Sequence, residues 1–227
     1  MPMRRIFFIT GTDTGIGKTT LAVLLTRFLR GRGVNAAALK PVCSGDRNDA
    51  RELLHAADGA LELNEINPWH FRAPLAPVLS ARREKKRLKL TDVLRHVKAI
   101  AQRFDVLLVE GAGGLLSPLG EDFNSLDLMV ALRAIPLIVA PDRLGTVNHM
   151  LLTLAALPRN SRDQARVILM SPQKPDAATK LNAPLLKEFF DGRRIFSLPW
   201  LGAKPELNRR FHPDVLRVLV RLSEARL

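Results

Sequence analysis

Two patterns of apolar and polar residues alternate along this chain. Short runs of consecutive apolar residues, typical of strands buried on both faces, precede stretches in which apolar residues recur every three or four positions, as on one face of a helix. This order predicts an α/β fold with a mostly parallel central sheet and helices on both faces. The predicted strands are Arg5–Thr10, Val34–Lys40, Val106–Glu110, Leu137–Ala140, Val167–Ser171 and Arg194–Leu198. The predicted helices are Lys18–Arg30, Ala50–Ala57, Thr91–Phe104, Leu126–Arg133, Val147–Leu157, Ala183–Phe190 and Pro213–Ala225.

Local signals mark some of the element boundaries. Gly31 and Gly33 close the first predicted helix, and Thr91 is predicted to cap the helix that starts beside it. No internal repeat, low-complexity linker or Ser/Gly-rich hinge divides the chain, and 227 residues suffice for one α/β domain with a full core. We therefore expect a single domain over residues 1–227.

A glycine-rich turn joins the first predicted strand to the first predicted helix. Residues 11–19 read Gly-Thr-Asp-Thr-Gly-Ile-Gly-Lys-Thr, and this turn between a strand and a helix is the context of a phosphate-binding loop. In such a loop, backbone N–H groups and the helix N-terminus surround the phosphates. Lys18 would reach the outer phosphates and Thr19 would bind Mg²⁺. Five residues separate Gly11 from Gly17, one more than in the common spacing, and a nucleoside triphosphate is the predicted ligand.

Polar residues also end two other predicted strands, at the sheet edge where open α/β sheets bind ligands. Lys40 precedes Pro-Val-Cys-Ser-Gly, and Glu110 precedes Gly-Ala-Gly-Gly. Taken alone, Lys40 would more often be a surface lysine, whereas an ordinary strand-end charge is the less frequent interpretation of Glu110. The neighbours of both residues favour a site. A carboxylate next to a phosphate loop usually supports Mg²⁺ directly or through water. Asp49, which opens the following helix, is a further candidate.

A net charge of +13 is the unusual feature of the composition. Much of it lies in the run Arg82–Lys89, and more lies toward the C-terminal end of the sequence. A basic excess can bind nucleic acid non-specifically, attract anionic substrates or form a solvated face. Because no stacking aromatics interleave with these runs and the chain has no Tyr, we interpret them mainly as solvated surface and expect no specific nucleic-acid partner.

Other classes of protein fit the composition poorly. No apolar run approaches the ~20 residues of a membrane helix, and the apolar stretch after Arg5 is too short for a secretory signal. The single cysteine, Cys43, rules out an internal disulfide framework and fits a reducing compartment. None of the five histidines has metal-ligand spacing, so no zinc site is expected. We therefore expect a cytoplasmic protein without a membrane association.

The motifs, taken in order, resemble the dethiobiotin synthetase family, ATP-dependent cyclo-ligases of the P-loop NTPase superfamily. The resemblance covers residues 7–206 and includes the longer phosphate loop. Its segments are Phe8–Thr19, Lys40–Gly45, Asn67–Phe71, Val109–Gly114, Leu144–His149 and Leu198–Leu201. It implies Mg²⁺, ATP as co-substrate and a homodimer with a shared active site. The implied reaction carboxylates 7,8-diaminononanoate with CO₂, phosphorylates the carbamate and closes the ring to dethiobiotin.

The resemblance also implies roles for individual residues. Lys18 and Lys40 would be catalytic, by stabilising charge on the transferring phosphoryl group, and Thr19, Asp49 and Glu110 would hold Mg²⁺. The implied nucleotide contacts are Gly15, Ile16, Gly17, Lys18, Thr19, Thr20, Asp49, Glu110, Gly111, Ala112, Gly113, Ser171, Pro172, Pro199, Trp200, Leu201 and Glu206. The implied contacts of the diamine and its carbamate are Thr14, Lys40, Ser44, Gly111 and Gly114. The substrate's remote carboxylate would be bound from the partner subunit by Gly145, Thr146, Val147 and Asn148.

Some features depart from the family pattern and leave alternatives open. Ser171-Pro172 stands where the family commonly has Asn to read adenine, so another nucleoside triphosphate could replace ATP. The loop between Ser44 and Asp49 is short, and the run Arg82–Lys89 has no family counterpart. One alternative is a partition- or MinD-like ATPase switch, but that class has a lysine where this chain has Asp13. The other is a non-catalytic nucleotide-binding regulator.

Overall fold

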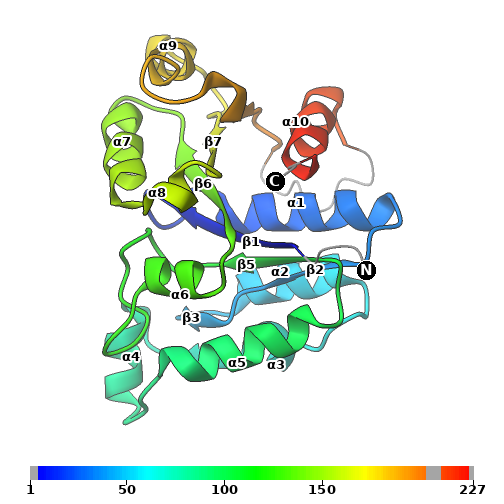
Figure 1. Cartoon of the computed structure of the whole chain (residues 1–227), viewed down its shortest axis with the longest axis vertical. Helices are drawn as coiled ribbons and strands as arrows, with labels where there is room; N and C mark the ends of the chain where they lie inside the picture. The colour runs from blue at the N-terminus through cyan, green and yellow to red at the C-terminus, as the bar shows by residue number, and fades with distance from the viewer. Residues whose placement is uncertain (1–4, 203–210, 225–227) are drawn as a thin grey trace.

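A computed structural model of the chain describes residues 5–202 and 211–224. Its central sheet has six strands, all paired in parallel, in the order β2-β5-β1-β6-β7-β8. Helices cover both faces of this sheet, with α1 and α10 on one side of β1 and α6 on the other (Figure 1). The predicted fold class is therefore confirmed. The strands are β1 (Arg5–Gly11), β2 (Ala36–Leu39), β5 (Val106–Glu110), β6 (Ile135–Pro141), β7 (Arg166–Met170) and β8 (Ile195–Leu198).

The helices alternate with these strands along the chain. On one side of the sheet α1 packs against α2 and α10, and elsewhere α5 packs against α6. No helix within residues 5–202 or 211–224 has the length and apolarity needed to span a membrane. The helices are α1 (Lys18–Gly31), α2 (Asn48–Ala57), α3 (Leu63–Ile66), α4 (Pro77–Arg83), α5 (Leu90–Ala101), α6 (Ser125–Ala131), α7 (Thr146–Ala156), α8 (Arg159–Arg162), α9 (Ala177–Leu186) and α10 (Pro213–Ser223), with a 3₁₀ turn at Gly192–Arg194.

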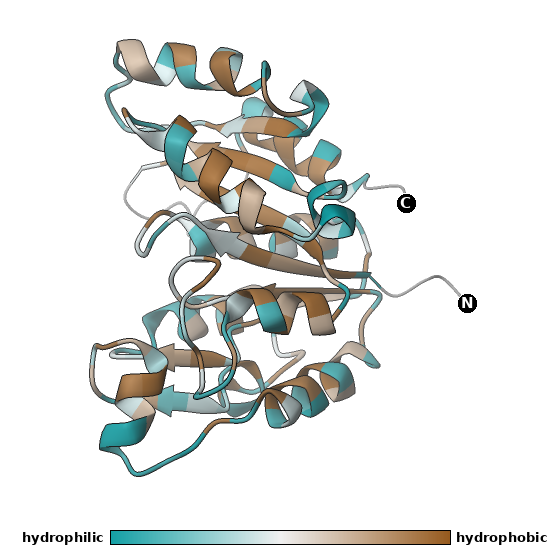
Figure 2. Cartoon of the chain, turned by 60° about the vertical axis from the view of Figure 1, so that its left-hand side comes forward, coloured by the Kyte–Doolittle hydropathy of each residue, from teal (hydrophilic) through white to brown (hydrophobic). Residues whose placement is uncertain are grey.

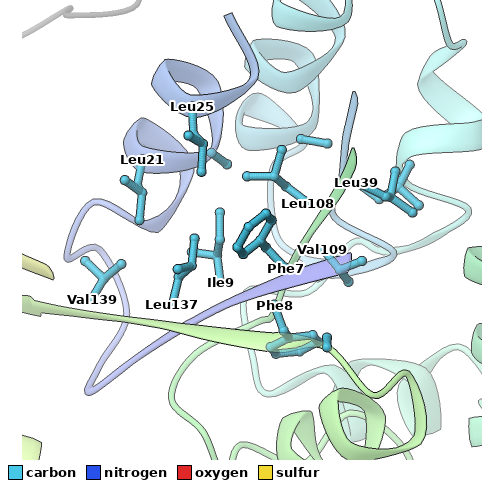
Figure 3. Packing of buried hydrophobic residues seen from close by; sticks show 14 of the residues in the cluster. Phe7, Phe8, Ile9, Leu21, Leu25, Leu39, Leu108, Val109, Leu137 and Val139 are labelled. Carbon is cyan, nitrogen blue, oxygen red and sulfur yellow. The ribbon is translucent and has the colours of Figure 1, made fainter. Parts of the chain in front are cut away.

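The core lies on both faces of β1, the strand next to the centre of the sheet. Successive side chains of a strand point to opposite faces, and Figure 3 shows Phe7 beside Leu21 and Leu25 of α1 while Phe8 lies on the other face. All of these side chains are buried. Both faces are covered, so the strands are apolar apart from a few polar residues, most of them at strand ends, and Figure 2 shows them as a mainly hydrophobic layer between more polar helices. The sheet edge that carries the motifs is therefore held by a rigid core.

Two short strands were not predicted. β3 (Val42–Ser44) and β4 (Trp69–Phe71) form a separate two-stranded parallel sheet. Three residues are too few to show an alternation of apolar and polar positions, so the sequence gives no strand signal there. β3 follows shortly after the end of β2 in the chain, and it contains Cys43 and Ser44.

The predicted starts of α5 and α9 were wrong for reasons that local hydrogen bonds show, and α2 begins at Asn48, two residues before its predicted start. α5 begins at Leu90, because the carbonyl of Lys89 already accepts the amides of Asp92 and Val93; Thr91 therefore lies inside the first turn and is not the cap. α9 begins at Ala177 and not at residue 183, because Asp176 caps it: its Oδ1 accepts the amide N–H of Thr179 at 2.9 Å.

The basic run Arg82–Lys89 covers the end of α4 and the connection to α5. Arg82 pairs with Glu121 at 2.6 Å, and Lys86 pairs with Glu84 at 2.8 Å. The other basic side chains of the run are exposed. These exposed pairs contribute little to stability, and the run is placed on the surface as the sequence indicated.

Candidate active site

A cavity of about 1060 Å³ opens at the carboxyl ends of the strands. Its size exceeds that of a typical small-molecule pocket, so it can hold a nucleotide together with a second small molecule. Four of the six motif segments contribute to it, namely Phe8–Thr19, Lys40–Gly45, Val109–Gly114 and Leu198–Leu201. Its walls come from residues 14–20, 40–52, 74–77, 110–118, 141–143, 170–172 and 199–202.

The phosphate-binding loop forms one wall of this cavity. Gly15 and Gly17 adopt the left-handed backbone conformation, with φ of 68° and 96°. Gly17 is also the N-cap of α1 and makes no side-chain cap hydrogen bond, so the first N–H groups of the helix are left for a ligand. Lys18 is 5% exposed, and its Nζ donates to the Asp13 carbonyl at 2.6 Å. Burial lowers the pKa of Lys18, although Glu110 acts in the opposite direction.

Lys40 and Glu110 form the charged centre of the site. Lys40 extends from the end of β2, and its Nζ lies 2.8 Å from Glu110 Oε1 and also pairs with Asp49. Thr19 Oγ1 donates to the same Glu110 oxygen at 2.9 Å. Burial alone would lower the pKa of Lys40, but the Glu110 and Asp49 carboxylates outweigh burial and raise it above the ordinary value. Lys40 is therefore held as a cation beside the phosphate-binding loop.

The oxygen atoms around this centre fit a magnesium ion. Glu110 Oε2 is buried and has no hydrogen-bond partner within the described part of the chain. The Thr19 hydroxyl contacts Glu110, and the Asp49 carboxylate contacts Lys40. Carboxylate and hydroxyl oxygens are the ligands that Mg²⁺ prefers. Unlike Glu110, the Asp49 side chain is 47% exposed, so it has room to turn toward a ligand in the cavity.

The residues predicted to bind the second substrate divide into two groups. Thr14 and Ser44 line the cavity, and the Ser44 hydroxyl donates to the carbonyl of Leu75, which also lines it. Gly111 and Gly114 do not line it. The Gly111 amide donates to the Ile9 carbonyl at 2.9 Å, and the Gly114 amide donates to Ser117 Oγ at 2.8 Å. Both amides are thus already committed within the chain.

The base-reading candidates lie at the other end of the cavity. Ser171 and Pro172 follow β7, and residues 199–202 follow β8. The Ser171 amide donates to the Leu198 carbonyl at 2.9 Å, which leaves its hydroxyl as the group that can meet a base. Pro199, Trp200 and Leu201 also line this end. Glu206 lies outside the described residues.

Residues 145–148 do not line the cavity of their own chain. Gly145, with φ of 90°, is the N-cap of α7, and Leu144 before it is 86% exposed. Thr146 is buried; its amide donates to the Arg143 carbonyl at 3.2 Å and its hydroxyl donates to the Pro141 carbonyl. The side chain of Thr146 is therefore committed, while Val147 and Asn148 stand at the start of a surface helix.

Sequence reasoning missed several residues of the cavity wall. Asp142 and Arg143 follow β6, and Met170 ends β7, so the rule that ligands bind at the carboxyl ends of strands could have found all three. Ser117 and residues 74–76 line the cavity from irregular loops, and Pro77 lines it from the first turn of α4. No periodic pattern in the sequence marks such loops.

Comparison with known proteins identifies the family. A family described as AAA domain matches residues 5–207. The ATP-dependent dethiobiotin synthetase BioD of Anaeromyxobacter dehalogenans strain 2CP-C is 39% identical over 91% of this chain and 93% of its own length. The protein of the same name from Bacillus subtilis strain 168 is 34% identical over 95% of this chain and 93% of its own length. The chain belongs to the dethiobiotin synthetase family. The resemblance based on the ordered motifs is confirmed.

Solved structures show the same P-loop fold outside the dethiobiotin synthetase family. The MinC:MinD cell division protein complex of Aquifex aeolicus matches with a TM-score of 0.61 and 14% identity, over 98% of this chain and 97% of that chain. A ParA family ATPase from Chlorobium tepidum TLS matches with a TM-score of 0.59 and 15% identity, over 97% and 98%. At such low identity the likeness concerns the fold alone, so it does not favour the switch-ATPase alternative.

Proposed function

We propose that this protein is an ATP-dependent ligase that converts 7,8-diaminononanoate and CO₂ into dethiobiotin, with ADP and phosphate as the other products. Membership of the dethiobiotin synthetase family supports the activity. The observation that carries it is the pairing of Lys40 with Glu110 beside the phosphate-binding loop, in a cavity that also extends to Ser44 and residues 74–77. This arrangement provides a place for a second substrate next to the terminal phosphate.

The proposed reaction has three stages. One amine of the diamine attacks CO₂, loses a proton and forms a carbamate. A carbamate oxygen then attacks the γ-phosphorus, and the bond to the β-phosphate oxygen breaks so that ADP leaves. The second amine attacks the carbamate carbon, loses a proton and closes the ring, and the C–O bond to phosphate breaks.

Lys18 and Lys40 would perform the electrostatic part of this reaction. They come from different segments and are both buried next to Glu110. Fixed cations on two sides of a transferring phosphoryl group stabilise the charge on its oxygens and hold the carbamate in line. Lys40 is paired with two carboxylates here, so an incoming anion would exchange places with at least one of them.

Thr19, Asp49 and Glu110 would hold Mg²⁺ in this proposal. The ion would supply positive charge to the phosphate oxygens of the nucleotide. Glu110 Oε2 is buried and has no hydrogen-bond partner among the described residues. This supports the assignment, because burial of a bare carboxylate oxygen is otherwise costly.

We also propose a homodimer in which residues 145–148 complete the neighbour's site. Leu144 and Leu152 of the α7 region are 86% and 62% exposed, which leaves an apolar face for a second copy. A helix N-terminus is a suitable site for a carboxylate, and Val147 and Asn148 lie in the first turn of α7. The cytoplasmic location expected from the sequence stays a prediction.

The test is direct synthesis by the purified protein. Mass spectrometry of a reaction with 7,8-diaminononanoate, bicarbonate, Mg²⁺ and ATP should show dethiobiotin, and omission of any one substrate should abolish it. If folded protein forms no dethiobiotin with ATP, GTP, CTP or UTP, the proposed function is wrong.

A further inference from the structure

Asn67 is 1% exposed, and its side chain binds residues 40–47 at the edge of the active site without itself lining the cavity. Its Nδ2 donates to the Lys40 carbonyl at 2.7 Å and to the Pro41 carbonyl at 3.4 Å. Its Oδ1 accepts from Arg47 Nε at 3.0 Å and from Cys43 Sγ at 3.2 Å. The amide therefore uses both its donor and its acceptor side within the chain.

Arg47 continues this network toward α2. Its Nη2 donates to the Asn67 carbonyl at 2.7 Å and to Asn64 Oδ1 at 3.2 Å. Arg47 is also the N-cap residue of α2, two positions before Asp49. Because a guanidinium is planar and binds several acceptors in fixed directions, it ties the start of α2 to the chain around Asn67.

The same contacts hold the backbone of Lys40 from both sides. The Lys40 amide donates to the Ile66 carbonyl at 3.1 Å, and the Lys40 carbonyl accepts from Asn67. The side chain then extends to Glu110 at 2.8 Å and to Asp49. A cation that acts on a transferring group has to be placed to within a fraction of an ångström, and that depends on the residues behind it.

We propose that Asn67, together with Arg47, is a positioning residue that sets the place of the Lys40 cation and of the Asp49 carboxylate. This inference rests on the proposed function of Lys40 in phosphoryl transfer. Asn67 acts through the backbone of Lys40 and does not touch the reacting groups. Its loss therefore lowers the rate of the reaction more than the affinity for ATP, which the phosphate-binding loop supplies.

The first experiment compares Asn67→Ala with Asn64→Ala as a matched control. Both asparagines accept a hydrogen bond from Arg47, but Asn64 is exposed and has no bond to the Lys40 strand end. We expect Asn67→Ala to lower kcat per folded enzyme by about 10- to 100-fold with KM for ATP changed less than about twofold, because misplacement of a catalytic group costs rate. Asn64→Ala should keep wild-type kcat. A wild-type kcat for folded Asn67→Ala would overturn the inference.

A double-mutant cycle separates positioning from a general structural role. If Asn67 acts mainly through Lys40, Asn67→Ala should cause a clearly smaller fold-loss of kcat in a Lys40→Ala background than in wild type, because only its effect through Arg47 on Asp49 remains there. Equal fold-losses in both backgrounds would show that Asn67 acts independently of Lys40 and would overturn the inference. Should Asn67→Ala not fold, Arg47→Lys, which keeps the charge and loses the planar fork, is taken through the same cycle with the same expectation.

Cys43 provides a readout that does not depend on turnover. It is the chain's single cysteine and is 5% exposed, and burial raises the pKa of its thiol. Asn67→Ala removes a side chain that lies 3.2 Å from Cys43 Sγ and helps to cover it, so alkylation by iodoacetamide should be faster in Asn67→Ala than in wild type or Asn64→Ala. Equal alkylation rates would overturn the inferred contact between Asn67 and Cys43 and with it the hydrogen-bond network.

A wild-type enzyme that forms no dethiobiotin would overturn the proposed function instead. Normal turnover of Lys40→Ala would overturn the role of Lys40 and the inference with it.

Discussion

Lys18 and Lys40 approach the same centre in different electrostatic settings. Burial lowers the pKa of Lys18, whereas Glu110 and Asp49 keep the pKa of Lys40 above its ordinary value. We expect Lys18→Ala and Lys40→Ala each to slow turnover at least ~100-fold, because a single charged group in a preorganised site stabilises the transition state by a few kcal/mol. Steady-state rates of dethiobiotin formation measure this.

Lys98→Ala is the control for these two variants, since Lys98 is exposed on α5 and should leave turnover unchanged. Lys40→Ala also leaves the buried Glu110 carboxylate without its cation, so its thermal midpoint should fall as well. Near-normal turnover of folded Lys40→Ala would show that Lys40 does not act at the reacting centre.

Nucleotide choice should be broad, because Ser171 offers the base one hydroxyl where a carboxamide would offer both a donor and an acceptor. Its amide is committed to Leu198, and Pro172 has no N–H. One hydrogen bond contributes about 0.5–1.5 kcal/mol, so GTP or CTP should support initial rates within roughly tenfold of ATP. Ser171→Asn should sharpen the preference for ATP. A wild-type preference above about a thousandfold would mean that other groups read the base.

The sequence predicted most of the charged centre but not its surroundings. Thr19, Lys40, Asp49 and Glu110 were all inferred from strand ends and the loop motif, and the structure brings them into contact. The sequence could not show that Asn67 binds the Lys40 carbonyl. The two residues lie far apart in the chain, and no periodic pattern of apolar residues around Asn67 indicates which segment it contacts.

At the scale of elements, Gly17 and Gly31 stand at opposite ends of α1 and should respond oppositely to alanine. Gly17 has φ of 96°, and a Cβ there would lie 2.7 Å from Met170 Cε, whereas a Cβ on Gly31 would meet nothing within 4 Å. Gly17→Ala should lower stability by about 1–3 kcal/mol through backbone strain and weaken ATP binding in calorimetry. Gly31→Ala should raise stability by about 0.5–1 kcal/mol. Wild-type ATP affinity in Gly17→Ala would contradict the role of this turn.

Asp142, in the loop after β6, should make the stability of the folded protein depend measurably on pH. It is 3% exposed, and burial raises its pKa above the ordinary 3.8, although Asn182 donates to its Oδ1 at 2.7 Å. The folded state therefore holds this proton more tightly than the unfolded chain, so stability falls as pH rises from about 3.8 through the folded pKa. Asp142→Asn removes this loss. In urea unfolding, its stability relative to wild type should increase between about pH 4 and about pH 7, and a pH-independent difference would contradict the prediction.

Continuous apolar runs were predictable, whereas three-residue strands and the start of α9 were not. All six strands of the main sheet were predicted to within two residues at each end, because buried parallel strands are continuous apolar runs. β3 and β4 are too short for a pattern, and the Asp176 cap that starts α9 looked like an ordinary loop residue. A local hydrogen bond from Thr179 to Asp176 decided the start of α9, and pairing between distant residues such as Val42 and Trp69 decided β3 and β4.

At the scale of the whole molecule, the apolar face of α7 should decide the oligomeric state. Leu152→Glu places a charge on that face, so the proposed dimer should dissociate and turnover should fall, since residues 145–148 would no longer reach the neighbour's cavity. Leu216→Glu, at a 41% exposed position on α10, is the control and should leave both properties unchanged. Light scattering and activity at the same concentration measure this. A fully active wild-type monomer would rule out the shared site.

The position of β1 in the sheet affects how the chain folds during its synthesis. Of the six strands, β1 is synthesised first, yet Arg5 pairs with Val106 and Phe7 pairs with Ile135. A nascent chain therefore carries the apolar run at Phe7 for about a hundred residues before a neighbouring strand can cover it. Pairing between such distant segments is slow and exposes the chain to wrong association. ATP can protect only the completed sheet, because the nucleotide site also needs residues from strands that leave the ribosome later.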